Sequence, residues 1–175
     1  MMTLYLTRKV GTAPIPLSLP ATPADIGNAF AKLDAICPAP SATEIYKVDS
    51  EVRNLNRYIC KADVENRETL RKLNQLAELL QGMSREDQMK MEGVLDSNSI
   101  NGIDDILNAA NRVKEYVLLE EVDSDRTLGN YLVEHGVIDC PENIKPYLDY
   151  VGIGAEFYSD HGGAYTLNGY VVRKT

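Results

Sequence analysis

The stretch LLEEVDSDRTLGNYLVEHG, from Leu118 to Gly136, is the most informative about the fold, because it joins a strand pattern directly to a helix pattern. The β-prone segment from Tyr116 to Val122 predicts a strand, and Asp123 or Ser124 then offers a side-chain oxygen that can cap a helix. Apolar side chains follow at helical spacing until Gly136 closes the helix. The stretch therefore predicts short strands that alternate with capped helices.

The same signals recur outside this stretch. Thr22 is a predicted N-cap, with Pro23 at the first helical position and Asp25 completing a variant capping box. Helical periodicity also predicts a helix that ends at Gly82 and another that Asn101 caps. Further predictions are a first strand at residues 2–10, a proline-rich crossing at 12–23, a strand at 44–48 and a hairpin at Asn168-Gly169.

Together these elements predict an α+β fold with short antiparallel sheets, helices and a central helical unit. We expect two or three small subdomains: an N-terminal α/β subdomain at 1–64, a helical subdomain at 65–100 and an acidic C-terminal α/β subdomain at 101–175. A weak internal repeat agrees with this division. ADIGNAFAKL at 24–33 aligns without gaps on DDILNAANRV at 104–113, and each is followed by V-D-S and then L-x-x-Y.

Negative charge is concentrated in one part of the chain. Residues 86–160 hold 17 acidic and 5 basic residues, a net charge of −12, while the whole chain has −8. Apolar residues recur at helical spacing inside this stretch, which a disordered acidic tail would lack. A charge run is most often a solvated face, but an acidic surface also resists DNA and anionic lipid and suits a basic partner.

Several classes of protein are disfavoured. No apolar run is long enough for a signal peptide or a membrane span, so we expect a cytoplasmic protein that binds no membrane. The three cysteines are widely spaced, which is typical of reduced thiols rather than of a disulfide framework. Glycine patterns that bind nucleotides and a nucleophile elbow are both missing from the sequence. We therefore predict no enzyme, no catalytic residues and no cofactor.

A calcium loop is one alternative for the central stretch. Asp123, Asp125 and Glu134 stand at positions 1, 3 and 12 of an EF-hand pattern. Leu128, however, occupies position 6, where the sharp turn requires glycine. His135 and His161 have no partner at ligand spacing either. We therefore predict a capped helix with surface carboxylates and no metal site.

The central stretch, with its V-x-S-D and L-G-x-Y-L-V-E patterns, resembles the antirestriction motif of the ArdA antirestriction proteins, which conjugative plasmids and transposons carry. Tyr5–Thr7, LPATPADI at 19–26, LNQLAELL at 73–80 and YLDY at 147–150 are also similar to that family. The chain departs from the family pattern in its proline-rich segment at 14–20, its lack of tryptophan and its ending. The resemblance thus covers most of the chain and indicates a divergent member.

The resemblance implies a dimeric mimic of bent B-form DNA. Such a protein occupies the DNA-binding groove of type I restriction-modification enzymes, formed by their specificity and methylase subunits, and binds no nucleic acid itself. Apolar motif residues contribute no charge to a mimic, so we expect packing or dimer contact from Leu128, Gly129, Tyr131, Leu132 and Val133.

The carboxylates that we expect to form the mimic surface act together rather than singly. They are Asp96, Asp104, Asp105, Glu115, Glu120, Glu121, Asp123, Asp125, Glu134, Asp139, Glu142, Asp149, Glu156 and Asp160. Two other functions stay open. One is an acidic binding module for another basic DNA-binding or defence protein, and the other is a small hydrolase built around Asp160-His161-Gly162 or a pair of carboxylates.

Overall fold

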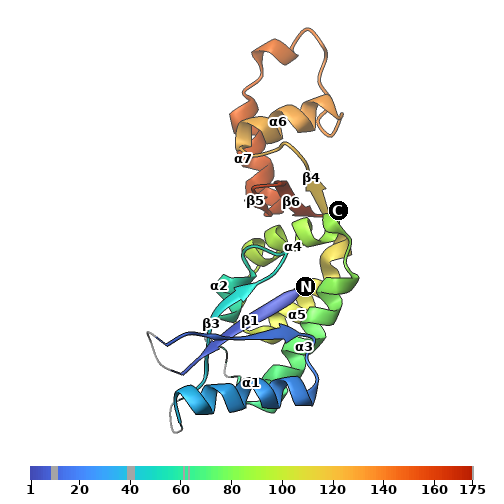
Figure 1. Ribbon diagram of the computed structural model, residues 1–175. Coiled ribbons are helices and arrows are strands. Elements are labelled where there is room, and N and C mark those ends of the chain that lie inside the picture. The colour runs from blue at the N-terminus through green and yellow to red at the C-terminus, as the bar shows by residue number, and fades with distance from the viewer. Residues whose placement is uncertain (9–11, 39–41, 61, 63, 175) are drawn as a thin grey trace.

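The computed structural model describes residues 1–8, 12–38, 42–60, 62 and 64–174, and over these residues it has seven α-helices and two three-stranded antiparallel sheets. The predicted α+β class is confirmed. Figure 1 shows an elongated molecule, with α1 and the first sheet at one end, α6 and α7 at the other, and α4 between them. The elements are, in chain order, β1 (Met2–Thr7), β2 (Ile15–Leu19), α1 (Pro23–Ile36), β3 (Glu44–Asp49), α2 (Leu55–Ile59), α3 (Arg67–Gly82), α4 (Arg85–Ser97), α5 (Ile103–Arg112), a 3-10 turn (Val113–Glu115), β4 (Tyr116–Leu119), α6 (Asp125–Glu134), a 3-10 turn (Lys145–Tyr147), α7 (Tyr150–His161), β5 (Ala164–Thr166) and β6 (Gly169–Arg173).

The first sheet has the strand order β2-β1-β3. Leu4 in the central strand pairs with Leu17 of β2 and with Val48 of β3, and all three side chains are buried. The first strand was predicted over residues 2–10; it is confirmed to Thr7, whereas its end at Val10 lies outside the described residues. Part of the predicted proline-rich crossing forms the edge strand β2, a position where proline is tolerated.

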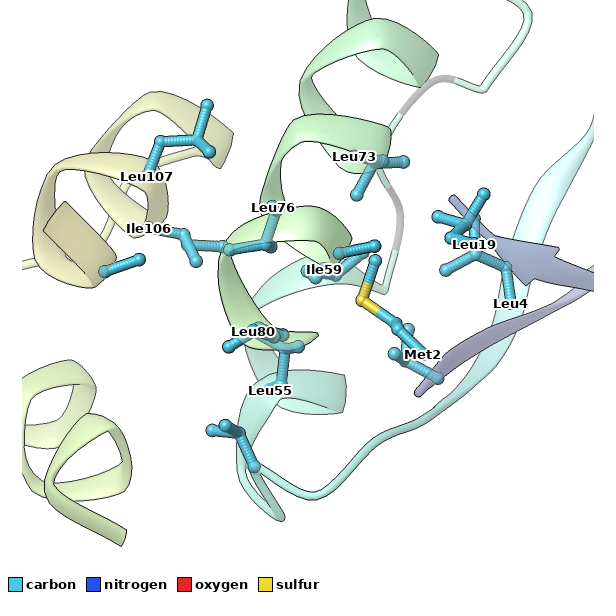
Figure 2. Packing of buried hydrophobic residues seen from close by; sticks show 14 of the residues in the cluster. Met2, Leu4, Leu19, Leu55, Ile59, Leu73, Leu76, Leu80, Ile106 and Leu107 are labelled. Carbon is cyan, nitrogen blue, oxygen red and sulfur yellow. The ribbon is translucent and has the colours of Figure 1, made fainter. Parts of the chain in front are cut away.

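The larger hydrophobic core lies between this sheet and the helices α2, α3 and α5. Figure 2 shows side chains from the sheet, from α2 and α3 and from α5 converging in it. They include Met2, Leu4, Leu19, Leu55, Ile59, Leu73, Leu76, Leu80, Ile106 and Leu107. Because α3 contributes to this core along its whole length, it serves as the spine of the first half of the molecule.

The smaller core lies at the other end, where α6 and α7 cover a sheet of order β4-β6-β5. Tyr170 in the central strand is fully buried there, together with Leu128 and Leu132 of α6. The helix α4 links the two cores: an added Cβ at Gly93 would collide with Val171 of β6, so only glycine permits this approach.

Several local predictions are confirmed. Thr22 and Asp25 form a reciprocal capping box at α1, and the Ser124 side chain caps α6. The predicted tail hairpin is formed by β5 and β6, in which Thr166 pairs with Gly169. Both segments of the sequence repeat have the same helix–strand–helix order, α1-β3-α2 and α5-β4-α6.

Other local predictions are wrong or incomplete. Gly102, not Asn101, is the N-cap of α5, and no side chain caps that end; instead the Asn101 backbone amide donates to Asp105. The strand predicted to Val122 ends at Leu119. The sequence analysis did not predict α7. The three-way division at 64/65 and 100/101 stays a prediction, while the buried residues form two clusters, the larger of which includes α5.

Candidate functional site

The net charge of the chain is located at one end of the molecule. Residues 116–172, from β4 to β6, hold ten acidic and two basic residues, a net charge of −8. The whole chain also has −8, so the remaining residues sum to zero. We call residues 116–172 the acidic unit; in Figure 1 it contains α6, α7 and the second sheet. The structure thus gives the charge a narrower location than the stretch 86–160.

The fourteen predicted carboxylates all reach the surface. Asp105, Glu115 and Asp125 are half-buried. The exposed residues are Asp96, Asp104, Glu120, Glu121, Asp123, Glu134, Asp139, Glu142, Asp149, Glu156 and Asp160. These residues therefore do not converge in a buried pocket, as catalytic carboxylates typically do.

Ion pairing separates the carboxylates outside the acidic unit from those within it. Outside the unit, Asp104 lies 2.8 Å from Nζ of Lys72, and Asp96 lies 3.9 Å from the Arg57 guanidinium. Glu115 is bound by the Arg112 and Arg173 guanidinium groups. The hydrogen bonds from Arg112 lower the pKa of Glu115 below its usual range. These carboxylates are partly neutralised by their own chain.

Within the acidic unit, one ion pair is found among the described residues, between Glu142 and Lys145 at 2.5 Å. Three other carboxylates make local hydrogen bonds: Asp123 accepts from the Thr127 hydroxyl, Asp149 from the Gly152 amide and Asp125 from the Tyr165 hydroxyl. The rest are exposed to solvent, with no ion pair in the described parts of the chain. They are Glu120, Glu121, Glu134, Asp139, Glu156 and Asp160.

The antirestriction-like motif forms the turn and helix that carry part of this charge. Ser124 Oγ accepts from the Thr127 amide at 3.4 Å, and Thr127 Oγ1 accepts from the Ser124 amide at 3.0 Å. This reciprocal cap fixes where α6 begins. Asp125, in the first turn, accepts from Tyr165 Oη at 2.8 Å, which ties the helix to the second sheet.

Two glycines allow α6 and α7 to cross with their backbones in contact. An added Cβ at Gly129 would collide with the carbonyl oxygen of Tyr150, and one at Gly154 would collide with the carbonyl oxygen of Asp125. The crossing therefore holds the carboxylates of the two helices in a fixed relation to each other.

The apolar motif residues face the interior. Leu128, Leu132 and Val133 are buried, so within this chain they pack rather than offer a contact surface. Tyr131 is half-buried and stacks on His135, with the ring centroids 3.9 Å apart.

Glu121 has an unusual backbone conformation. Its φ is +63°, and it is the only residue other than glycine with a positive φ among the described residues. This left-handed conformation normally favours glycine. Glu121 lies in the turn after β4, and together with Glu120 and Asp123 it lines an open groove beside the hairpin and α4. The motif thus places an acidic side chain where glycine would be more stable.

The residues considered for catalysis or metal binding are used locally. His161 stacks on Phe157 with the centroids 4.0 Å apart, and both His161 and Asp160 are exposed at the end of α7. Over the residues that the structure describes, no group of three or more His, Cys, Asp or Glu side chains could hold a metal ion. Cys37, Cys60 and Cys140 are half-buried, and none of them forms a disulfide among the described residues. No helix in the described ranges is long and apolar enough to cross a membrane.

One buried carboxylate was not predicted from the sequence. Glu92 of α4 has 6% of its surface exposed and contacts Arg53 and Asn168, which are far from it in sequence. Neither local periodicity nor charge counting could identify it, because its partners come together only in the folded chain.

Comparison with known proteins identifies one family. The model of the family described as Antirestriction protein (ArdA) matches residues 15–172, nearly the whole chain. A comparison with curated proteins finds no match.

Proposed function

This chain belongs to the ArdA family of antirestriction proteins, a non-enzymatic family, and we propose that it inhibits type I restriction-modification enzymes by mimicking DNA. The observation that carries this proposal is that the acidic unit holds a net charge equal to that of the whole chain, and that nine of its ten carboxylates lack an ion pair among the described residues. We propose the specificity and methylase subunits as the partner, because these subunits bind DNA.

Electrostatics supports a DNA-binding partner. Duplex DNA carries a negative charge about every 1.7 Å of its axis, and its binding proteins present Lys and Arg to this charge. A carboxylate within an ion pair is already neutralised, whereas an unpaired one can replace a phosphate. The six carboxylates of the acidic unit that have neither an ion pair nor a hydrogen bond among the described residues therefore contribute most, and Asp96, Asp104 and Glu115 contribute less.

Rigidity also favours mimicry over a flexible acidic tail. The carboxylates lie on a capped helix, on the helix that crosses it, on the turn after β4 and on the connection of residues 135–149 between the two helices. A surface that is ordered before binding avoids the entropic cost of ordering it on the enzyme. The mimic offers no base to cut or methylate, so the enzyme would stay occupied without turnover. We expect a homodimer, as the family resemblance implies, and a cytoplasmic location, as the sequence predicts.

Identification of the binding partner tests this proposal. The tagged protein is used to capture proteins from a host with a type I system, and we expect the specificity and methylase subunits among them. In the same host, expression should restore the plating of unmodified phage. Capture of unrelated basic proteins alone, with restriction unchanged, would favour a binding module for another partner.

A further inference from the structure

We propose that Glu92, Arg53 and Asn168 form a polar clamp that fixes the orientation of the acidic unit relative to the first half of the molecule. Glu92 lies in α4, Arg53 lies just before α2, and Asn168 lies in the turn between β5 and β6. The clamp therefore joins three segments that are distant in sequence, at the junction of the two halves.

The contacts close a ring among the three side chains. Glu92 Oε1 accepts from the Arg53 backbone amide at 3.0 Å and from its Nε at 3.1 Å. Arg53 Nη2 donates to Asn168 Oδ1 at 2.9 Å, and Asn168 Nδ2 donates to Glu92 Oε2 at 3.3 Å. Each side chain thus contacts both of the others.

Because the Glu92 side chain is buried, the free energy of its carboxylate depends on where its two partners lie. Glu92 is the only buried carboxylate among the residues that the structure describes. A buried charge is unfavourable unless it is paired and hydrogen-bonded. Movement of the hairpin away from α4 would remove the Asn168 contact and leave one carboxylate oxygen without that donor. The charge therefore favours one placement of the hairpin.

The apolar part of the junction constrains this orientation less tightly. Gly93 packs closely on Val171, but apolar contact is not directional, whereas hydrogen bonds require a narrow range of distance and angle. We infer that apolar packing holds the halves together and that the clamp selects their relative angle. If the proposed function holds, this angle decides which carboxylates a DNA-binding groove meets together.

Distance measurements between two spin labels test the clamp without any partner. Labels are attached to cysteines introduced at Gln75 of α3 and Ala155 of α7, both exposed, after the three native cysteines have been replaced by serine. The parent should give one narrow distance distribution. Asn168→Ala should broaden it about twofold or add a second distance, because the link to the hairpin is lost. Asn108→Ala, an exposed asparagine on α5, is the matched control and should leave it unchanged.

Arg53→Ala is a second variant, with Arg57→Ala as its control. The Arg53 side chain is 54% exposed, so its truncation should preserve the fold, which circular dichroism checks. An unchanged distribution in both clamp variants would overturn the proposal. If one clamp variant unfolds, the distance distribution of the other variant tests the proposal alone, and an unchanged distribution would overturn it.

A functional measurement separates the clamp from the proposed function on which its consequence rests. If Asn168→Ala reduces the competent orientation to about a third of the population, inhibition should weaken about threefold although the net charge is unchanged. Broadened distances with unchanged inhibition would support the clamp and overturn its role in recognition. Unchanged distances would overturn the clamp whatever the inhibition.

Discussion

Gly129 of α6 lies against the backbone carbonyl of Tyr150 of α7, so closely that any β-carbon at residue 129 would collide with the carbonyl oxygen. Gly154 of α7 makes the same kind of approach to the carbonyl of Asp125. The two helices are thus joined by reciprocal glycine contacts, and the stability of the acidic unit depends on both contacts.

We expect Gly129→Ala to destabilise the acidic unit, because a backbone carbonyl cannot move aside as a flexible side chain can. Overpacking of this kind costs about 1–3 kcal/mol, measurable as the free energy of unfolding in urea. The control is Gly27→Ala in α1, where an added Cβ meets nothing within 4 Å and should stabilise the helix by about 0.5–1 kcal/mol. Equal effects at the two sites would contradict the close crossing.

Charge reversal should depend on location rather than on total charge. Glu120, Glu134, Glu156 and Asp160 are unpaired and exposed in the acidic unit, and their joint replacement by lysine should abolish inhibition with the fold retained. The control replaces Glu44, Asp49 and Glu78, three exposed residues of the first half that have no ion pair among the described residues, and it is compared at equal net charge with a triple variant of Glu134, Glu156 and Asp160. Restriction assays should show loss of inhibition for the variants of the acidic unit only. Equal loss for both would mean that total charge, not the acidic unit, governs binding.

Glu121→Gly should stabilise the protein, because glycine relieves the left-handed backbone conformation at φ +63°. The gain should be about 1 kcal/mol in the urea unfolding free energy. Inhibition should change little, since the carboxylates act together and only one is removed. A loss of stability would show that the Glu121 side chain makes a favourable contact that outweighs the strain.

Alkaline pH should destabilise the second sheet through its buried tyrosines. Burial raises the pKa of Tyr170 to about 12, and burial with the hydrogen bond to Asp125 raises the pKa of Tyr165 above its usual range. The unfolded tyrosines ionise near pH 10. The stability that these groups contribute is therefore complete below pH 10 and is lost as the pH rises toward 12.

Tyrosinate absorbance gives a direct measurement, because the chain has ten tyrosines and no tryptophan to mask them. Tyr170→Phe should remove one late-ionising group from the titration and reduce the loss of melting temperature between pH 10 and 12. A titration in which the missing group ionises near pH 10 would contradict the burial argument.

Local signals in the sequence predicted the capped helices and the tail hairpin, because a cap or a turn needs only a few neighbouring residues. Thr22 and Ser124 are examples, and both cap as expected. The helix α7 was missed because Gly152 and Gly154 have low helix propensity, and packing on α6 compensates for the second of them.

The location of the unpaired charge also could not be predicted from the sequence alone. Counting along the sequence identified residues 86–160, but the pairing of Lys72 with Asp104, 32 residues apart, exists only in the folded chain. The structure therefore moves the unpaired charge into residues 116–172. Long-range pairing also explains why the contacts of Glu92 with Arg53 and Asn168 could not be predicted.

The central claim is that the acidic unit takes the place of DNA on the enzyme, and competition for the enzyme measures it most directly. A labelled duplex with the recognition sequence is bound to the specificity and methylase subunits of a type I enzyme, and the protein is added at increasing concentration. We expect complete displacement of the duplex. The protein concentration needed for half-displacement should rise in proportion to the duplex concentration. A stable complex that contains enzyme, duplex and protein together would contradict the account.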